Sequence, residues 1–189
     1  MTLFAVKSKT HAISILKEDH DNVKALFDKF EEAKSKAQQM KLAEKAIHEL
    51  KVHATIEEEL FYPAVRQEME DPEGLMDEAD EEHHVAKVLI AELDMMTGKE
   101  EHWEAKFIVL AENIRHHIKE EEGEMLPKAE KTDIDFEALG ERMLARKKEL
   151  ESKGIPPDAE AKMLKKVGLR GDSPAKNAQK KIAVPLLQG

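Results

Sequence analysis

One pattern occurs twice in this sequence and limits the fold more than any other feature. The two copies begin at His53 and His117, and each has a glutamate four residues later, Glu57 and Glu121. Each copy also has a proline ten residues after its histidine, which is expected to disturb a helix because proline lacks the backbone N–H. Positions four apart lie on one face of a helix. The histidine and the glutamate of each copy are therefore expected to point toward one spot.

The spacing of apolar residues, three and four apart, predicts four consecutive helices and places a histidine in the apolar stripe of each. The first helix is expected to begin near Thr10 and the second near Met40. Adding 63 to the stripe of the first helix gives the third, and adding 64 to the second gives the fourth, so the chain is read as a tandem repeat of a helical hairpin. The stripes are Ile13, Leu16, His20, Val23, Phe27 and Phe30; Ala43, Ala46, Leu50, His53, Glu57 and Leu60; Met76, Ala79, His83, Ala86, Ile90 and Leu93; and Phe107, Leu110, Ile114, His117, Glu121 and Glu124.

The predicted fold class is all-α, an up-down-up-down four-helix bundle over residues 1–131. A C-terminal fifth helix is expected over residues 132–153, running from about Asp135 to Lys153. Residues 154–189 carry seven Lys/Arg against three Asp/Glu and several glycines and prolines. This composition predicts a basic, flexible tail, within which a short helix over residues 159–167 is compatible with the sequence.

Composition narrows the class of function. Charged residues make up 37% of the chain and aromatic residues 4%, which favours helices. The net charge of −10 argues against nucleic acid as a partner. The chain has no cysteine, which excludes disulfides and thiolate metal sites. With no long apolar run, we expect no membrane association and a cytoplasmic location.

The candidate metal ligands are chosen by convergence. A single histidine in an apolar stripe is usually a hydrogen-bonded core residue, but here four helices each direct one toward the bundle axis. Burying two carboxylates beside four imidazoles is costly without a cation. The expected metal ligands are His20, His53, Glu57, His83, His117 and Glu121.

Neighbouring residues are weaker candidates. His84 is out of phase with its stripe, so His83 is preferred over it. His116 has an acidic residue at the same spacing, Glu120, but the repeat aligns His117 with His53, so His116 is expected at the surface or against a ligand. His11, His48 and His102 are expected to be exposed, and Tyr62 is a secondary candidate for lining the site.

The ligand count favours two metal ions. Four imidazoles and two carboxylates are too many for one tetrahedral zinc and too rich in nitrogen for calcium or magnesium. Two ions, each with two histidines and both bridged by Glu57 and Glu121, use every ligand and leave open positions. Mixed nitrogen and oxygen ligands with open positions favour iron, in an oxo- or hydroxo-bridged Fe²⁺/Fe³⁺ pair.

These residues resemble the hemerythrin-like, or HHE cation-binding, domain, in its bacterial branch. The resemblance covers residues 10–130, including the segment from Glu57 to Pro63, and implies a four-helix bundle holding a non-haem di-iron centre. The respiratory oxygen carriers of the wider family have a second histidine four residues beyond the one on the third helix, where this chain has Lys87. Their second carboxylate is an aspartate one residue further along. These departures argue against simple reversible oxygen carriage.

The resemblance implies a protein that binds or reacts with peroxide, O₂ or NO at open iron positions, with catalase-like activity as one form. An O₂, NO or iron sensor, an O₂-binding protein, and iron storage or donation are the alternatives. For the tail, docking of a protein partner through residues 182–187 is the alternative to disorder, without other support in the sequence. The sequence does not fix whether the chain is an enzyme, its small-molecule ligand or its oligomeric state.

Overall fold

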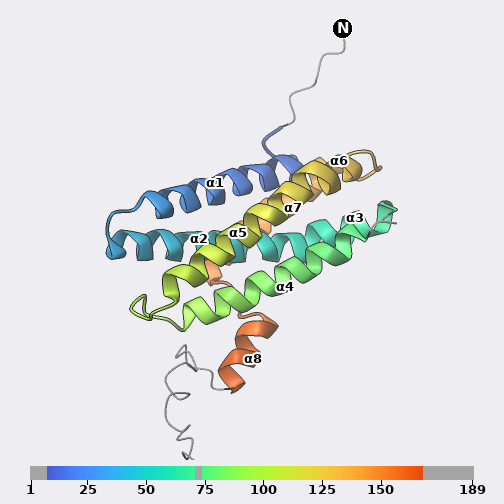
Figure 1. Ribbon diagram of the computed structural model, residues 1–189. Helices are drawn as coiled ribbons and strands as arrows, with labels where there is room; N and C mark the ends of the chain where they lie inside the picture. The colour runs from blue at the N-terminus through green and yellow to red at the C-terminus, as the bar shows by residue number, and fades with distance from the viewer. Residues whose placement is uncertain (1–7, 71–73, 168–189) are drawn as a thin grey trace, which may run out of the picture.

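The computed structural model describes residues 8–70 and 74–167, and this part of the chain is helical without strands (Figure 1). The elements in chain order are α1 (Ala12–Glu32), α2 (Lys36–Ile56), η1 (Glu57–Phe61), α3 (Tyr62–Glu68), α4 (Leu75–Asp94), α5 (Trp103–Glu120), η2 (Glu121–Met125), α6 (Leu126–Ala129), α7 (Phe136–Lys153) and α8 (Ala159–Val167). The two η segments are single π-helical turns. None of the helices in the described ranges has the length and apolar character that crossing a membrane requires.

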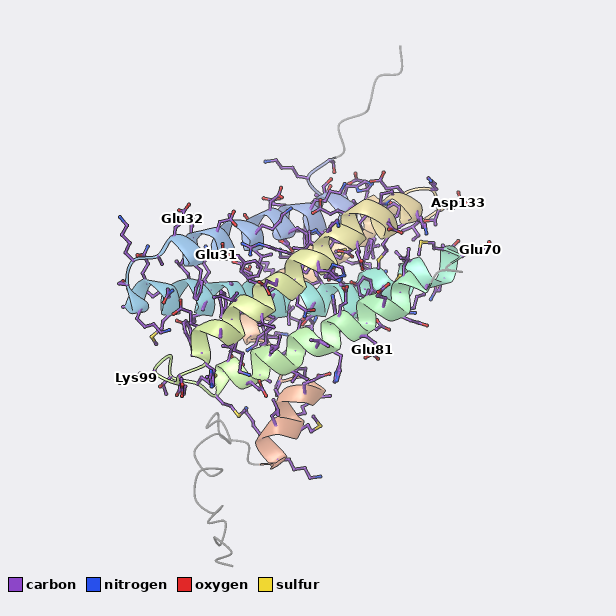
Figure 2. All side chains as sticks on the ribbon, viewed as in Figure 1. Glu31, Glu32, Glu70, Glu81, Lys99 and Asp133 are labelled. Carbon is purple, nitrogen blue, oxygen red and sulfur yellow. The ribbon has the colours of Figure 1, made fainter. Side chains whose placement is uncertain are left out.

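Two helical hairpins form the bundle, α1 with α2 and α4 with α5. Helix α7 packs across α1 and α2, and α8 lies against α4 at the edge of the bundle (Figure 1). Charged side chains such as Glu32, Glu81 and Lys99 are exposed at the surface (Figure 2). The predicted all-α class, the four-helix bundle and its added C-terminal helix are confirmed.

The core divides into two apolar clusters, one toward each end of the bundle. One cluster gathers residues of α1, α3, α6 and α7, with Leu16, Phe61 and Met143 fully or almost fully buried. The other is rich in aromatic rings, including Phe30 and Phe107, whose centroids are 4.3 Å apart. The histidine-bearing turns lie between the two clusters, so apolar packing on both sides holds them in position.

The predicted helix starts agree with the structure at α1 and α7 but not at α2. Asp135 accepts a hydrogen bond from the backbone N–H of Ala138, as expected for the start of α7. Ser35 caps α2 in the same way, so this helix begins several residues before the predicted Met40. The predicted start was wrong because it rested on the apolar stripe alone, whereas Ser35 supplies an N-cap in the polar segment before it. Helix α1 begins next to the predicted Thr10, at Ala12.

The proline that ends each repeated stretch follows a π-helical turn. The backbone N–H of Tyr62 binds the carbonyl of Glu57, and that of Leu126 binds the carbonyl of Glu121, five residues back in each case. The wider turn accommodates the proline, and the helical path continues into α3 and α6. The extra residue advances the buried face by one position. Glu124, predicted at the end of a buried stripe, is therefore exposed.

The C-terminal helices are fixed by specific contacts. Gly140 of α7 lies so close to the start of α1 that an added Cβ would be 1.8 Å from the carbonyl oxygen of Thr10. The hydroxyls of Ser8 and Thr10 both donate to Glu137 at 2.7 Å. Beyond α7, the segment compatible with a short helix does form one, α8, and it packs on α4. Residues 168–189 lie outside the described residues.

Candidate metal centre

The six residues selected from the sequence converge on one buried region between the two hairpins. The first group joins His20 of α1 and His53 of α2, whose Nε2 atoms are 3.2 Å apart. The Nε2 of His20 is 3.1 Å from an oxygen of Glu121, and that of His53 is 3.1 Å from an oxygen of Glu57. These four side chains can place their donor atoms around one metal ion.

The second group is the counterpart from the other hairpin. The Nε2 atoms of His83 on α4 and His117 on α5 are 3.3 Å apart. An oxygen of Glu57 is 3.4 Å from His83, and one of Glu121 is 3.9 Å from His117. Both glutamates therefore lie between the two histidine pairs, which is the arrangement expected for carboxylates that bridge two ions.

The two buried glutamates carry negative charge that needs compensation by a cation. Both side-chain oxygens of Glu57 and both of Glu121 are buried and make no hydrogen bond of good geometry. Burial raises the pKa of the Glu57 carboxyl, but the charges and hydrogen bonds of His53 and His83 together outweigh burial and hold that pKa well below its ordinary value. Burial lowers the pKa of His53, but the charges and hydrogen bonds of Glu57 and Asp19 together outweigh burial and raise that pKa to about 10. In the metal-free centre the imidazole of His53 therefore holds a proton that a metal ion would displace.

Each of the four histidines also contacts a carboxylate through its outer ring nitrogen, Nδ1. The pairs are His20 with Glu122 at 2.9 Å, His53 with Asp19 at 3.5 Å, His83 with Glu58 at 2.9 Å, and His117 with Glu82 at 2.7 Å. A carboxylate at Nδ1 keeps the proton on that nitrogen and turns the Nε2 lone pair inward. The same type of contact, a carboxylate at Nδ1, therefore orients all four rings with Nε2 toward the centre.

The four outer carboxylates follow the internal repeat, although they were missed from the sequence. Asp19 and Glu82 each precede a stripe histidine and contact the histidine of the next helix within the same hairpin. Glu58 and Glu122 each follow a stripe glutamate and contact a histidine of the other hairpin. The sequence carries a signal, since acidic residues occupy both pairs of equivalent positions, but glutamates beside an apolar stripe are usually exposed, so the signal is weak.

Lysines bind three of these carboxylates, and one of the three is Asp19, which pairs with Lys147 of α7. Lys87 lies 2.5 Å from Glu58, and Lys24 lies 3.5 Å from Glu122. Both lysines are four residues beyond a stripe histidine and occupy equivalent positions in the repeat. The position where the respiratory carriers have a further histidine therefore holds a cation that binds an outer carboxylate.

The ambiguous candidates are separated by burial. His83 is 5% exposed, whereas the side chain of His84 is 51% exposed and binds Glu160 of α8. The His116 side chain is 57% exposed, in line with the expected surface position. His11 is half-buried and stacks on Phe136, so its expected exposure was wrong because α7 covers the start of α1.

Tyr62 lines the centre, as proposed from its position after Glu57. Its hydroxyl lies 3.2 Å from the Nε2 of His83, on the inner side of that ring. Burial and then the charges of Glu121 and Glu57 raise the pKa of Tyr62 well above its ordinary value, so the phenol keeps its proton. The equivalent position in the second copy is Leu126, so this hydroxyl breaks the symmetry of the two halves.

A cavity of about 990 Å³ opens between α2 and α4 and reaches all four histidines. Aliphatic side chains such as Leu50, Ile90 and Ile114 form much of its wall. An ion pair between Lys51 and Asp94 joins the two helices beside it. Residues 155–158 and three residues of α8, Ala161, Lys162 and Lys165, also line it. The cavity that reaches the centre therefore combines aliphatic side chains with charged ones.

Comparison with known proteins agrees with this geometry. Residues 11–129 match the family model described as the hemerythrin HHE cation binding domain. The chain is also similar to a hemerythrin HHE cation binding domain-containing protein from Mycobacterium kansasii, whose crystal structure it matches with a TM-score of 0.62 and 28% sequence identity. That match covers 86% of this chain and 94% of the other. No curated protein matched.

Proposed function

We propose, since the chain belongs to the hemerythrin HHE cation binding domain family, that it holds two iron ions and reacts with peroxide, O₂ or NO. His20 and His53 would bind one ion, His83 and His117 the other, and both would share Glu57 and Glu121. The observation that carries the proposal is the position of the two glutamates, buried without hydrogen bonds between two histidine pairs.

The donor set supports a pair of redox-active ions. Two imidazoles and two shared carboxylates supply about four ligands to each ion, which leaves open positions in a six-coordinate metal. An iron pair at these ligands supplies Lewis-acid and two-electron redox chemistry. Catalase-like turnover of two peroxide molecules into O₂ and two water molecules needs that capacity and no other reductant.

The protein's own residues supply orientation, proton donation and exclusion of water. The outer carboxylates fix the imidazole rings, and the aliphatic part of the cavity wall admits small uncharged molecules while limiting water. Tyr62, protonated at neutral pH, is placed to donate a hydrogen bond to a molecule beside His83. Only one half has such a donor, so we expect the reactive molecule to bind on the side of His83 and His117.

The test begins with anaerobic reconstitution with ferrous iron, followed by metal analysis and Mössbauer spectroscopy. We expect two irons per chain, O₂ evolution on addition of peroxide, and a change in the ultraviolet–visible spectrum. His83→Ala should lower iron content, and the matched variant His84→Ala should not. Fewer than two irons per chain would refute the di-iron centre; two irons without a peroxide response would refute the reaction.

A sensor is the second candidate, favoured by one contact. Glu160 of α8 binds His84 at 2.8 Å, directly after the proposed ligand His83. A change in coordination at His83 therefore has a short route to the C-terminal helix. Backbone hydrogen exchange of α8, measured on the iron-loaded protein with and without NO, distinguishes a sensor from a protein that only reacts with its ligand. A sensor is expected to show changed exchange in α8. Unchanged exchange would remove the support for sensing.

A further inference from the structure

A third group of metal-binding side chains lies outside the buried centre, on the face shared by α4 and α5. The Nε2 of His116 is 3.2 Å from an oxygen of Glu120 and 3.6 Å from an oxygen of Glu82. One donor atom from each of the three residues falls within 4.8 Å of the others. The neighbouring buried ligands are His117 and Glu121, so the outer pair repeats their spacing one residue earlier.

No lysine or arginine compensates the charge of this group. Glu120 contacts His116, and Glu82 lies between His116 and His117; within the described ranges neither carboxylate pairs with a lysine or arginine. The Glu82 side chain is only 14% exposed, so water screens its charge poorly. A cation held between the carboxylates would relieve their repulsion.

The geometry suits a small metal ion. Ligands bound at about 2.1 Å to one ion are about 3.0 to 3.4 Å apart for right-angle to tetrahedral geometry. The two contacts of His116 lie close to these separations. One imidazole with two carboxylates suits first-row divalent ions rather than calcium. The exposed side of His116 leaves room for water to complete the coordination.

Glu82 connects this group to the buried centre. One of its oxygens faces His116, and the other accepts a hydrogen bond from the Nδ1 of His117 at 2.7 Å. The first hairpin has no equivalent, because Val52 and Ile56 occupy the positions of His116 and Glu120 in the repeat. The group therefore belongs to one half of the molecule.

We propose that Glu82, His116 and Glu120 form a surface site for a divalent first-row transition metal, separate from the buried centre and linked to it through Glu82. An ion at this site withdraws electron density from Glu82 and weakens its hold on the Nδ1 proton of His117. Occupancy of the outer site thus alters the electronic environment of one half of the buried centre. The proposal does not depend on the reaction proposed above.

Cobalt(II) titration of the full-length, metal-free chain tests the site, because cobalt(II) bound by protein ligands has visible absorption bands. We expect His116→Ala to remove one equivalent of cobalt relative to the unaltered chain. His84→Ala is the matched control, since it removes an exposed histidine that contacts one carboxylate, Glu160, outside the proposed site. Circular dichroism checks that both variants fold. Equal cobalt stoichiometry in the unaltered chain and His116→Ala overturns the proposal.

A second measurement tests the link through Glu82. Zinc(II), which is spectroscopically silent, is added to the iron-loaded chain while the iron absorption is recorded. We expect a shift in the unaltered chain and none in His116→Ala. A shift of the same size in both overturns the link. Failure of the buried centre to load with iron would leave the one-equivalent difference in the cobalt titration intact, so the two proposals fail separately.

Discussion

Replacing Glu58 by glutamine tests whether the outer carboxylates tune metal binding. Glu58 accepts from the Nδ1 of His83 at 2.9 Å and from Lys87 at 2.5 Å. Burial raises the pKa of Glu58, but the hydrogen bonds and charges of His83 and Lys87 together outweigh burial and lower that pKa, so the side chain is charged at neutral pH. The glutamine keeps the shape and an acceptor oxygen but removes the charge.

The contact geometry sets the expected size of the effect. A hydrogen bond to a charged group contributes about 1.5 to 3 kcal/mol. The Glu58 side chain is 32% exposed, so solvent screening places the loss at the lower end, about 1.5 kcal/mol. With about 1.4 kcal/mol for each factor of ten, we expect roughly tenfold weaker binding of one metal ion.

Competition with a chromophoric chelator measures the affinity of each ion in the variant. We expect one ion to bind about tenfold more weakly and the second to change little, in the range found when carboxylates behind metal-binding histidines are replaced. Glu59→Gln is the matched control, because Glu59 pairs with Arg146 and not with a ligand. Equal affinities in both variants would refute the reasoning.

Three further changes have defined outcomes. The pKa of His53 is about 10 in the folded metal-free chain, against an ordinary value of 6.5. The protonated histidine therefore stabilises the fold fully below pH 6.5, and this contribution is lost as the pH rises through about 10. The thermal unfolding temperature of the metal-free chain should fall over that pH range. Gly140→Ala places a methyl group against the carbonyl of Thr10, so chemical denaturation should show a loss of about 1 to 3 kcal/mol, and an unchanged midpoint would contradict the close approach. Tyr62→Phe should keep both irons but slow the peroxide reaction by about tenfold or more, measured by stopped-flow absorption, and an unchanged rate would remove the hydroxyl from the reaction.

The sequence located the buried centre because helical periodicity and an internal repeat point to the same positions. No local motif surrounds His20 or His83. They were found only because each occupies a position of an apolar stripe where a hydrophobic residue is expected. Their burial at 1% and 5% agrees with that reasoning. The helical periodicity also distinguished His83 from His84, because adjacent residues point about 100° apart around the helix axis.

Other features depend on contacts that periodicity does not describe. The π-helical turns change the phase after Glu57 and Glu121, so a stripe extended at constant spacing fails at Glu124. The outer carboxylates lie on helix faces next to the stripe, where exposed glutamates are common. The burial of His11 depends on α7, whose docking side follows from the close approach at Gly140. Each of these requires the packed arrangement of several helices.

The exchange of carboxylates between hairpins has a consequence for folding. Glu58 comes from the first hairpin and contacts His83 of the second, while Glu122 of the second contacts His20 of the first. Each half therefore orients histidines that belong to the other, and neither half alone contains the complete set of proposed ligands. Metal binding should then follow the docking of the hairpins, and bound ions should couple them into one cooperative unfolding unit. Loss of the metal is expected to divide that unit, with the interface between the hairpins separating at a lower temperature than the interfaces within them.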